Sequence, residues 1–310
     1  MRQIAFTVLR GFLMGSADIV PGVSGGTVAL VLGIYRRLIA SIRSGSSAIG
    51  MLLRGDVRRA RGYLGEVEWV FLISLLSGVL LAIVTLAHLV ETLLADYPVP
   101  MAGLLFGLVL GSVVVAWQLL ERRDATRIML LVLAAGATFV LLGLRESTST
   151  DDVGGGGGGQ PLVVFFLSGA IAICAMILPG ISGSFLLVML GMYASVLAAV
   201  TDRDLLTLAV FALGCAVGLG LFSQVLHWAL GHHYDTVMAI LVGLMVGSVR
   251  VLWPWPNGVD STALGAPTGP VAVPILLAVL ALVVVVAFDH IARRLEHRSS
   301  ADEVADLQAS

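Results

Sequence analysis

The residues of this chain that could do chemistry lie in two short breaks of the same form, Pro-Gly-x-Ser-Gly, each set inside an apolar stretch. The first break is Pro21–Gly25 and the second is Pro179–Gly183, 158 positions later. Proline ends a helix, glycine allows a turn with positive φ, and serine can cap the helix that follows. A helix interrupted in this way presents backbone N–H groups beside a hydroxyl, and these donors can bind an anion. The two breaks therefore predict two anion-binding turns.

We expect the substrate-binding residues to come from both breaks and from one arginine. The predicted set is Gly22, Ser24, Gly25, Gly26, Thr27, Gly180, Ser182, Gly183, Ser184 and Arg250. Arg250 is included because a helix terminus contributes only roughly 0.3–2 kcal/mol toward an anion, far less than the cost of removing water from a phosphate. Two simpler interpretations stay open. The glycines can serve close helix packing, and Arg250 can extend to the outer headgroups.

Asp18 is the unusual charge beside the first break. It stands in the last turn of the preceding apolar arm, where the negative end of a helix disfavours a carboxylate. Its counterpart in the second copy is Met176, so the shared fold does not require an acid here. Because an acid at membrane depth is a functional hypothesis by default, we expect Asp18 to couple transport to a proton or cation, or to pair with an arginine. The alternative is that Asp18 caps the turn.

The two breaks belong to a longer internal repeat. Gly11–Ile39 matches Gly169–Leu197, and Gly107–Ser112 (GLVLGS) recurs 136 positions later as Gly243–Ser248 (GLMVGS). The two offsets differ because a basic insert, 41–66, occurs only in the first copy. Broken helices at matching places in two halves are typical of transporter binding sites. The predicted organisation is a first repeat at 1–148, a glycine-rich linker at 149–160, a second repeat at 161–298 and a polar, disordered tail at 299–310.

Composition indicates a membrane protein. Apolar residues make up 58% of the chain and charged residues 12%, with a mean hydropathy of +1.00, which leaves too few polar residues to cover a soluble domain. Six stretches are long enough to cross a bilayer. They are Val70–Val90, Met101–Leu120, Ile128–Leu144, Leu205–Leu230, Val237–Trp253 and Val271–Phe288. The predicted fold is an all-α polytopic membrane protein with two inverted repeats, each a re-entrant broken-helix hairpin followed by three transmembrane helices.

The re-entrant hairpins follow from arm length and from the arginines. An arm of about fifteen residues rises about 22 Å, which is short of a hydrocarbon core of about 30 Å. With the N-terminus inside and three spans in each half, all the arginines fall on the cytoplasmic side except Arg145, Arg203 and Arg250. This is a strong positive-inside bias among the 18 basic residues. It predicts an inner (plasma) membrane protein with both termini in the cytoplasm.

Three segments carry a resemblance to a known family. They are MGSADIVPGVSGGTVALVLGIYRRLI, AICAMILPGISGSFLLVMLGMY and GSVRVLWPW. Together they resemble the signature segments of the bacterial and archaeal polyprenyl-phosphate transporter family, formerly a domain of unknown function. The resemblance covers about Arg10 to Ala287 and leaves out the six-glycine linker and the polar tail. It implies a flippase that returns undecaprenyl phosphate, the lipid carrier of cell-wall synthesis, from the outer to the cytoplasmic leaflet.

Two other classes of function remain open. A small-anion transporter or channel would use the same helix N-termini. A membrane enzyme that hydrolyses the lipid phosphate would need a nucleophile with a positioned base, and no histidine lies near either Ser-Gly break in the sequence. We therefore expect a transporter and not an enzyme, with the membrane and a polyprenyl phosphate lipid as its partners. We expect no cofactor, no metal site and no nucleic acid partner.

Overall fold

The structure is a computed structural model of the whole chain. It describes residues 2–19, 24–143, 160–181, 183, 186–187, 190–256, 258, 264–267, 269 and 271–309, without the side chains of 2, 53 and 291–309. The predicted site residues Gly22, Ser182 and Ser184, and residues 149–159 of the predicted linker, lie outside this description. The helices are α1 (Arg2–Asp18), α2 (Gly25–Val31), α3 (Tyr35–Leu53), α4 (Val57–Glu66), α5 (Trp69–Asp96), α6 (Pro98–Gln118), α7 (Ala125–Gly143), α8 (Leu162–Ile177), α10 (Tyr193–Thr201), α11 (Leu205–His232), α12 (Tyr234–Ser248), the 3-10 helix η2 (Val249–Leu252) and α13 (Ala272–Ala309).

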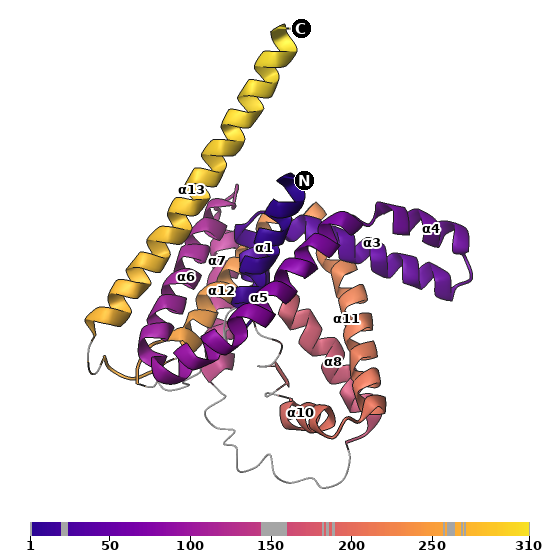
Figure 1. Cartoon of the computed structure of the whole chain (residues 1–310), viewed down its shortest axis with the longest axis horizontal. Helices are drawn as coiled ribbons and strands as arrows, with labels where there is room; N and C mark the ends of the chain where they lie inside the picture. Colours follow the sequence, from indigo (N-terminus) through magenta and orange to yellow (C-terminus); the bar gives the residue numbers. More distant parts are fainter. Residues whose placement is uncertain are drawn as a thin grey trace.

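The prediction of an all-α polytopic membrane protein is confirmed (Figure 1). No strand occurs among the described residues, and six helices are long and apolar enough to cross a membrane. These helices are α5, α6, α7, α11, α12 with η2, and the first half of α13, which match the six predicted spans. Their outer surfaces carry large apolar side chains such as Val84 and Leu276, which are 83% and 69% exposed. Such surfaces suit a lipid environment, because exposing large apolar side chains to water is unfavourable.

The first break separates helices of very different length. The arm before it, α1, has 17 residues, but the arm after it, α2, has only seven. The chain then turns through Gly33, which has a φ of +70°, and α3 leaves at 119° to α2. The same turn occurs in the second copy at Gly191, with a φ of +67°. Glycine adopts this left-handed conformation without a steric penalty, so both copies bend at the same place.

Helices that correspond between the two halves make corresponding contacts. α1 packs along α5, and α8 packs along α11. In the first pair a Cβ on Gly78 would overlap the carbonyl oxygen of Val8, and in the second a Cβ on Gly214 would overlap that of Phe166. Gly78 and Gly214 are 136 positions apart, and Val8 and Phe166 are 158 apart, so both offsets are those of the sequence repeat. The repeat is therefore also a repeat of three-dimensional contacts.

The other helices pair across the two halves. α6 packs against α13 and α12 packs against α7, and these pairs lie side by side in Figure 1. Gly107 on α6 meets the carbonyl of Ala278, and Gly243 on α12 meets that of Leu131. The recurring GLVLGS and GLMVGS segments thus provide equivalent close-packing surfaces. In each of these two pairs, one helix comes from the first half of the chain and the other from the second half. The two halves are therefore interlocked.

Two segments outside the spans are also helical. The basic insert forms the second part of α3 together with α4, and this helical hairpin extends sideways from the bundle (Figure 1). α13 continues without interruption to Ala309. The polar tail expected at 299–310 is the last part of this helix as far as 309. A helix that is already formed propagates at little cost through alanine, glutamate and leucine, which are good helix formers.

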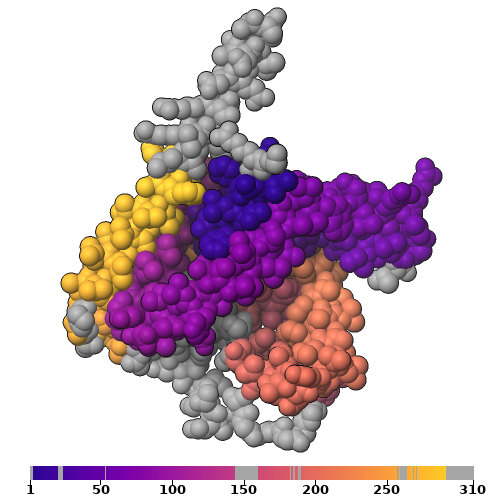
Figure 2. All heavy atoms as spheres, viewed as in Figure 1, coloured from indigo at the N-terminus to yellow at the C-terminus, as the bar shows by residue number. Residues whose placement is uncertain are grey.

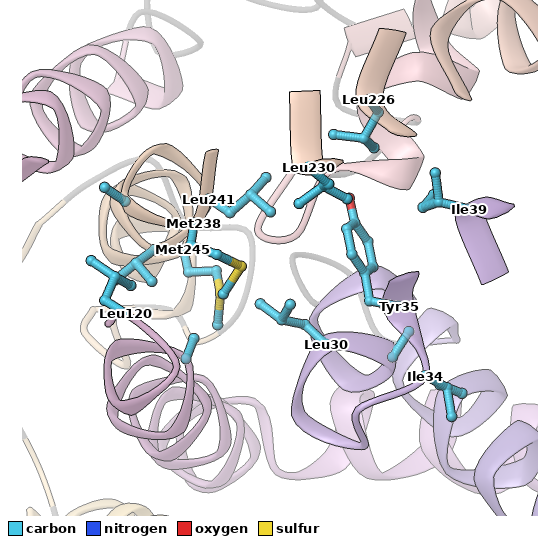
Figure 3. Close-up of a cluster of buried hydrophobic side chains, with 14 of the residues drawn as sticks. Leu30, Ile34, Tyr35, Ile39, Leu120, Leu226, Leu230, Met238, Leu241 and Met245 are labelled. Carbon is cyan, nitrogen blue, oxygen red and sulfur yellow. The ribbon is translucent and has the colours of Figure 1, made fainter. Parts of the chain in front are cut away.

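The main core cluster lies where the first hairpin meets the second half (Figure 3). Leu30, Ile34 and Tyr35 come from the first hairpin, while Met238 and Met245 come from α12. Figure 3 shows the ring of Tyr35 beside Leu230 and the side chains of Met238 and Met245 between α12 and Leu30. Tyr35 and Met245 are 2% and 0% exposed. This packing holds the first break against the second half of the chain.

Candidate functional site

The two breaks, far apart in the sequence, are in contact in the structure. The backbone N–H of Gly180 donates a hydrogen bond to Oγ1 of Thr27 at 3.1 Å. The hydroxyl of Tyr35 donates to the carbonyl oxygen of Ile177 at 3.2 Å. The hydroxyl of Ser24 lies 3.4 Å from the carbonyl oxygen of Met176, at the limit of hydrogen bonding. These contacts tie the start of α2 to the end of α8.

The contacts between the breaks are shielded from solvent. Ser24, Thr27 and Tyr35 are 5%, 2% and 2% exposed. Each of these side chains carries a hydroxyl, which is costly to bury without a hydrogen-bond partner. Their partners are backbone groups at the end of α8 and in the second break, namely the carbonyl oxygens of Met176 and Ile177 and the N–H of Gly180. The break supplies unpaired backbone groups, and the facing repeat supplies the hydroxyls that satisfy them.

The N-terminus of α2 is occupied by groups of the chain itself. Asp18 Oδ1 accepts a hydrogen bond from the N–H of Gly25 at 2.6 Å, and Ser24 Oγ accepts one from the N–H of Gly26 at 3.2 Å. The N–H of Thr27 is bonded to the carbonyl oxygen of Ser24 at 2.9 Å. With seven residues, α2 contributes individual donors and only a small helix dipole. Any further anion would therefore have to replace Asp18 at this turn.

Glycine is required by close approach at the meeting point. A Cβ on Gly26 would lie 2.7 Å from the carbonyl oxygen of Ile177. Gly180 has a φ of +86°, and a Cβ there would lie 2.8 Å from Cα of Met245 on α12. Gly183 has more room, since its nearest neighbour would be the carbonyl oxygen of Ala172 at 3.0 Å. The packing interpretation of these glycines thus describes Gly26 and Gly180 well.

Arg250 lies on η2, directly after α12, and faces the last turns of α7. Its guanidinium carbon is 4.7 Å from the ring centre of Phe139. A Cβ on Gly143 would lie 2.7 Å from the same carbon, so the guanidinium rests on the end of α7. The described contacts of Asp18 are with Gly25 on α2. The structure thus brings together Asp18, Ser24, Gly25, Gly26, Thr27 and Gly180, and places Arg250 against a different helix.

The comparisons with known proteins identify the family. A family model described as VCA0040-like, undecaprenyl phosphate translocase-like, matches residues 14–265. The chain belongs to this family. It is 42% identical over 253 residues to a polyprenyl-phosphate transporter of Vibrio cholerae, covering 80% of this chain and 77% of the relative. It is 30% identical over 259 residues to a polyprenyl-phosphate transporter of Staphylococcus aureus, covering 80% of this chain and 85% of the relative. No solved structure matches the chain.

One residue of the meeting point was not singled out from the sequence of this translocase-like chain. Tyr35 joins α3 to the second break through its hydroxyl, although tyrosine in an apolar stretch is normally a packing residue. The available signal was its recurrence as Tyr193 at the equivalent place in the second copy. Tyr193 is 44% exposed, so the two tyrosines have different environments. The break region is therefore less symmetric than the helix pairs around it.

Proposed function

We propose that this protein is a transporter that moves polyprenyl phosphate across the membrane, as the names of its relatives describe for them. The observation that carries the proposal is the meeting of the two broken segments, one from each half, through Thr27 and Gly180. Broken helices that converge in a membrane protein are the usual place for a polar substrate group, because backbone donors are available there away from bulk water. In a polyprenyl phosphate, the phosphate is the polar group that would need these hydrogen-bond donors within the membrane.

The direction that we propose is from the outer to the cytoplasmic leaflet. Transport in this direction would return undecaprenyl phosphate for reuse as the carrier lipid of cell-wall synthesis. We place the protein in the plasma membrane, with both termini in the cytoplasm and with two inverted repeats. The repeated glycine contacts support two copies of one fold, and the uneven distribution of arginines supports their opposite orientation.

The substrate phosphate is bound first by hydrogen-bond donors of one break and then by those of the other. In the first break we assign Gly22, Ser24, Gly25, Gly26 and Thr27, and in the second Gly180, Ser182, Gly183 and Ser184. Asp18 occupies the N–H of Gly25 in this conformation, so phosphate and carboxylate compete for one donor. A proton or cation on Asp18 would weaken its hold on Gly25 and free the donor. This competition gives Asp18 a coupling role without a direct contact to the lipid.

Arg250 provides the cation at the outer side of the pathway. Its guanidinium is a planar fork that matches phosphate oxygens. The ring of Phe139 and the end of α7 hold it in place. Arg250→Lys keeps the charge and loses the fork, so it should weaken substrate uptake, while Arg250→Ala should nearly abolish it.

Leaflet exchange by the purified protein tests the function. Liposomes with labelled undecaprenyl phosphate are assayed for its movement between leaflets and for release of inorganic phosphate. We expect movement without release. Release of phosphate would instead indicate an enzyme. Flux of inorganic phosphate without movement of the lipid would indicate a small-anion transporter.

A further inference from the structure

A groove lies on the outside of the first hairpin, between the two halves of the chain. Its volume is about 290 Å³, and it is lined by α1, by the end of α2 with the turn after it, and by Phe288 and Asp289 of α13. Figure 2 shows α1 and α13 next to each other on one face of the molecule. Phe6, Leu9 and Phe288 line it and are 57%, 52% and 51% exposed. Large exposed apolar side chains of this kind suit contact with lipid acyl chains.

Among the side chains that the structure describes, Arg10 is the one basic residue that lines this groove. It stands in the middle of α1, eight residues before Asp18, which corresponds to about 12 Å along the helix. The residues beside it in the groove, Leu9 and Leu13, are apolar. A cation with apolar neighbours on the cytoplasmic side of a membrane protein is placed where it can attract an anionic lipid headgroup. Its position fits an anionic headgroup whose attached chain stays in apolar surroundings.

The groove reaches the far end of the helix that begins at the first break. Leu30, Val31 and Gly33 line it, and Leu30 is also part of the main core. α2 therefore has Ser24 at one end and the groove at the other, separated by about 10 Å of helix. A second groove of about 360 Å³, lined by Val283 and Val286, continues along α13 past Asp289. Together the two grooves offer a mostly apolar surface beside the guanidinium of Arg10.

We propose that this groove is a lateral binding site for polyprenyl phosphate, with the phosphate on Arg10 and the first isoprene units against α1 and α13. The inference rests on the proposed transport function and extends it to the arginine-rich side of the protein, where the lipid would leave for the cytoplasmic leaflet. A volume of about 290 Å³ is at the small end for ligand sites. It suits a headgroup and the start of a single chain, while the rest of the chain lies in the bilayer.

Substitution of Asp289 tests the proposal in the other direction from substitution of Arg10. This carboxylate also lines the groove, and a negative charge there does not favour a phosphate. Arg10→Gln should therefore weaken lipid binding roughly tenfold or more, because a hydrogen bond to a charged group is lost. Arg10→Lys should retain part of the binding. Asp289→Asn should leave it equal or make it tighter.

Photo-crosslinking measures binding in the groove independently of transport. The photoreactive residue p-benzoylphenylalanine replaces Leu9, or as a control Val84, which is 83% exposed on α5 outside the groove. Labelled undecaprenyl phosphate is added to proteoliposomes of the full chain. We expect crosslinking at position 9 that exceeds crosslinking at 84, that falls in Arg10→Gln, and that unlabelled polyprenyl phosphate displaces. Arg58→Gln, on the exposed helix α4, is the matched control and should change nothing.

Three results would overturn the site. They are equal crosslinking at positions 9 and 84, equal displacement by phosphatidylglycerol, and unchanged crosslinking and transport in a folded Arg10→Gln. If the wild type exchanges lipid between leaflets while any of these results is found, only the groove proposal fails. If the wild type moves no lipid between leaflets, the proposed function fails first.

Discussion

The carboxylate of Asp18 takes the place that a side chain on Gly25 would need. Oδ1 accepts the hydrogen bond from the N–H of Gly25 at 2.6 Å, and both carboxylate oxygens would overlap a Cβ at that position. The two residues are therefore matched to each other in size as well as in hydrogen bonding. At Gly183 of the second break, a Cβ would instead approach the carbonyl of Ala172 and the Cβ of Met176, the counterpart of Asp18.

The match predicts a specific dependence between two substitutions. Gly25→Ala should displace the carboxylate and lower thermal stability in detergent, because a charge-assisted hydrogen bond worth roughly 1.5–3 kcal/mol is lost. Adding Asp18→Ala should cost little more, because the displaced group is no longer present. A double-mutant cycle on unfolding midpoints measures this coupling. Strictly additive losses would show that the two residues act independently.

The repeated glycine contacts predict matched effects in the two halves. Gly78→Ala and Gly214→Ala should each destabilise the protein by about 1–3 kcal/mol, because each new methyl group would overlap a backbone carbonyl. Gly136→Ala on α7 is the control, since no atom lies within 4 Å of its Cβ position. It should be neutral or slightly stabilising, as alanine favours helix. Melting temperatures of the three variants decide the matter, and an effect in only one half would contradict equivalent packing.

The sequence predicted the spans well because long apolar stretches have few alternative structures in a membrane protein. The pairing of the helices was harder to predict from the sequence. Nothing in GLVLGS at Gly107 indicates that this segment packs against α13 of the other half. The sequence left open that Asp18 caps the turn, but it did not identify the N–H of Gly25, seven positions later, as the group that Asp18 binds. Arg250 was assigned from its neighbours in the sequence. Its contact with Phe139, more than a hundred positions away, depends on how α7 packs against α12.

Labelling of single cysteines tests the inverted topology. Gly62→Cys lies on the exposed face of α4, and Asp202→Cys lies in the exposed turn after α10. Both are introduced into a chain in which Cys174 and Cys215 are replaced by alanine. An impermeant maleimide added to intact cells should label position 202 and leave position 62 unlabelled until the membrane is opened. Labelling of both from the outside would contradict the inverted arrangement.

The bond between Thr27 and Gly180 predicts how firmly the two breaks are joined. Thr27→Val keeps the shape and removes the acceptor, which leaves a buried N–H without its partner and costs about 1–3 kcal/mol. Thr27→Ser keeps the hydroxyl and should lose much less. Thermal unfolding of the purified variants gives the difference. Equal midpoints for Thr27→Val and Thr27→Ser would mean that the hydroxyl contributes nothing to the contact.

The substitution Asp18→Asn distinguishes a role of Asp18 in coupling transport to an ion gradient from a role in pairing with Arg250. The amide keeps the shape of the side chain and can still accept a hydrogen bond from Gly25, but it cannot bind a proton or carry charge. If Asp18 couples transport, exchange of undecaprenyl phosphate down its own gradient should persist, while acceleration by an imposed proton or cation gradient should vanish. If Asp18 instead pairs with Arg250, Asp18→Asn and Arg250→Ala should fail alike. The measurement is uptake of labelled lipid by liposomes with and without the ion gradient. Wild-type rates under both conditions would reduce Asp18 to the cap of the turn at Gly25.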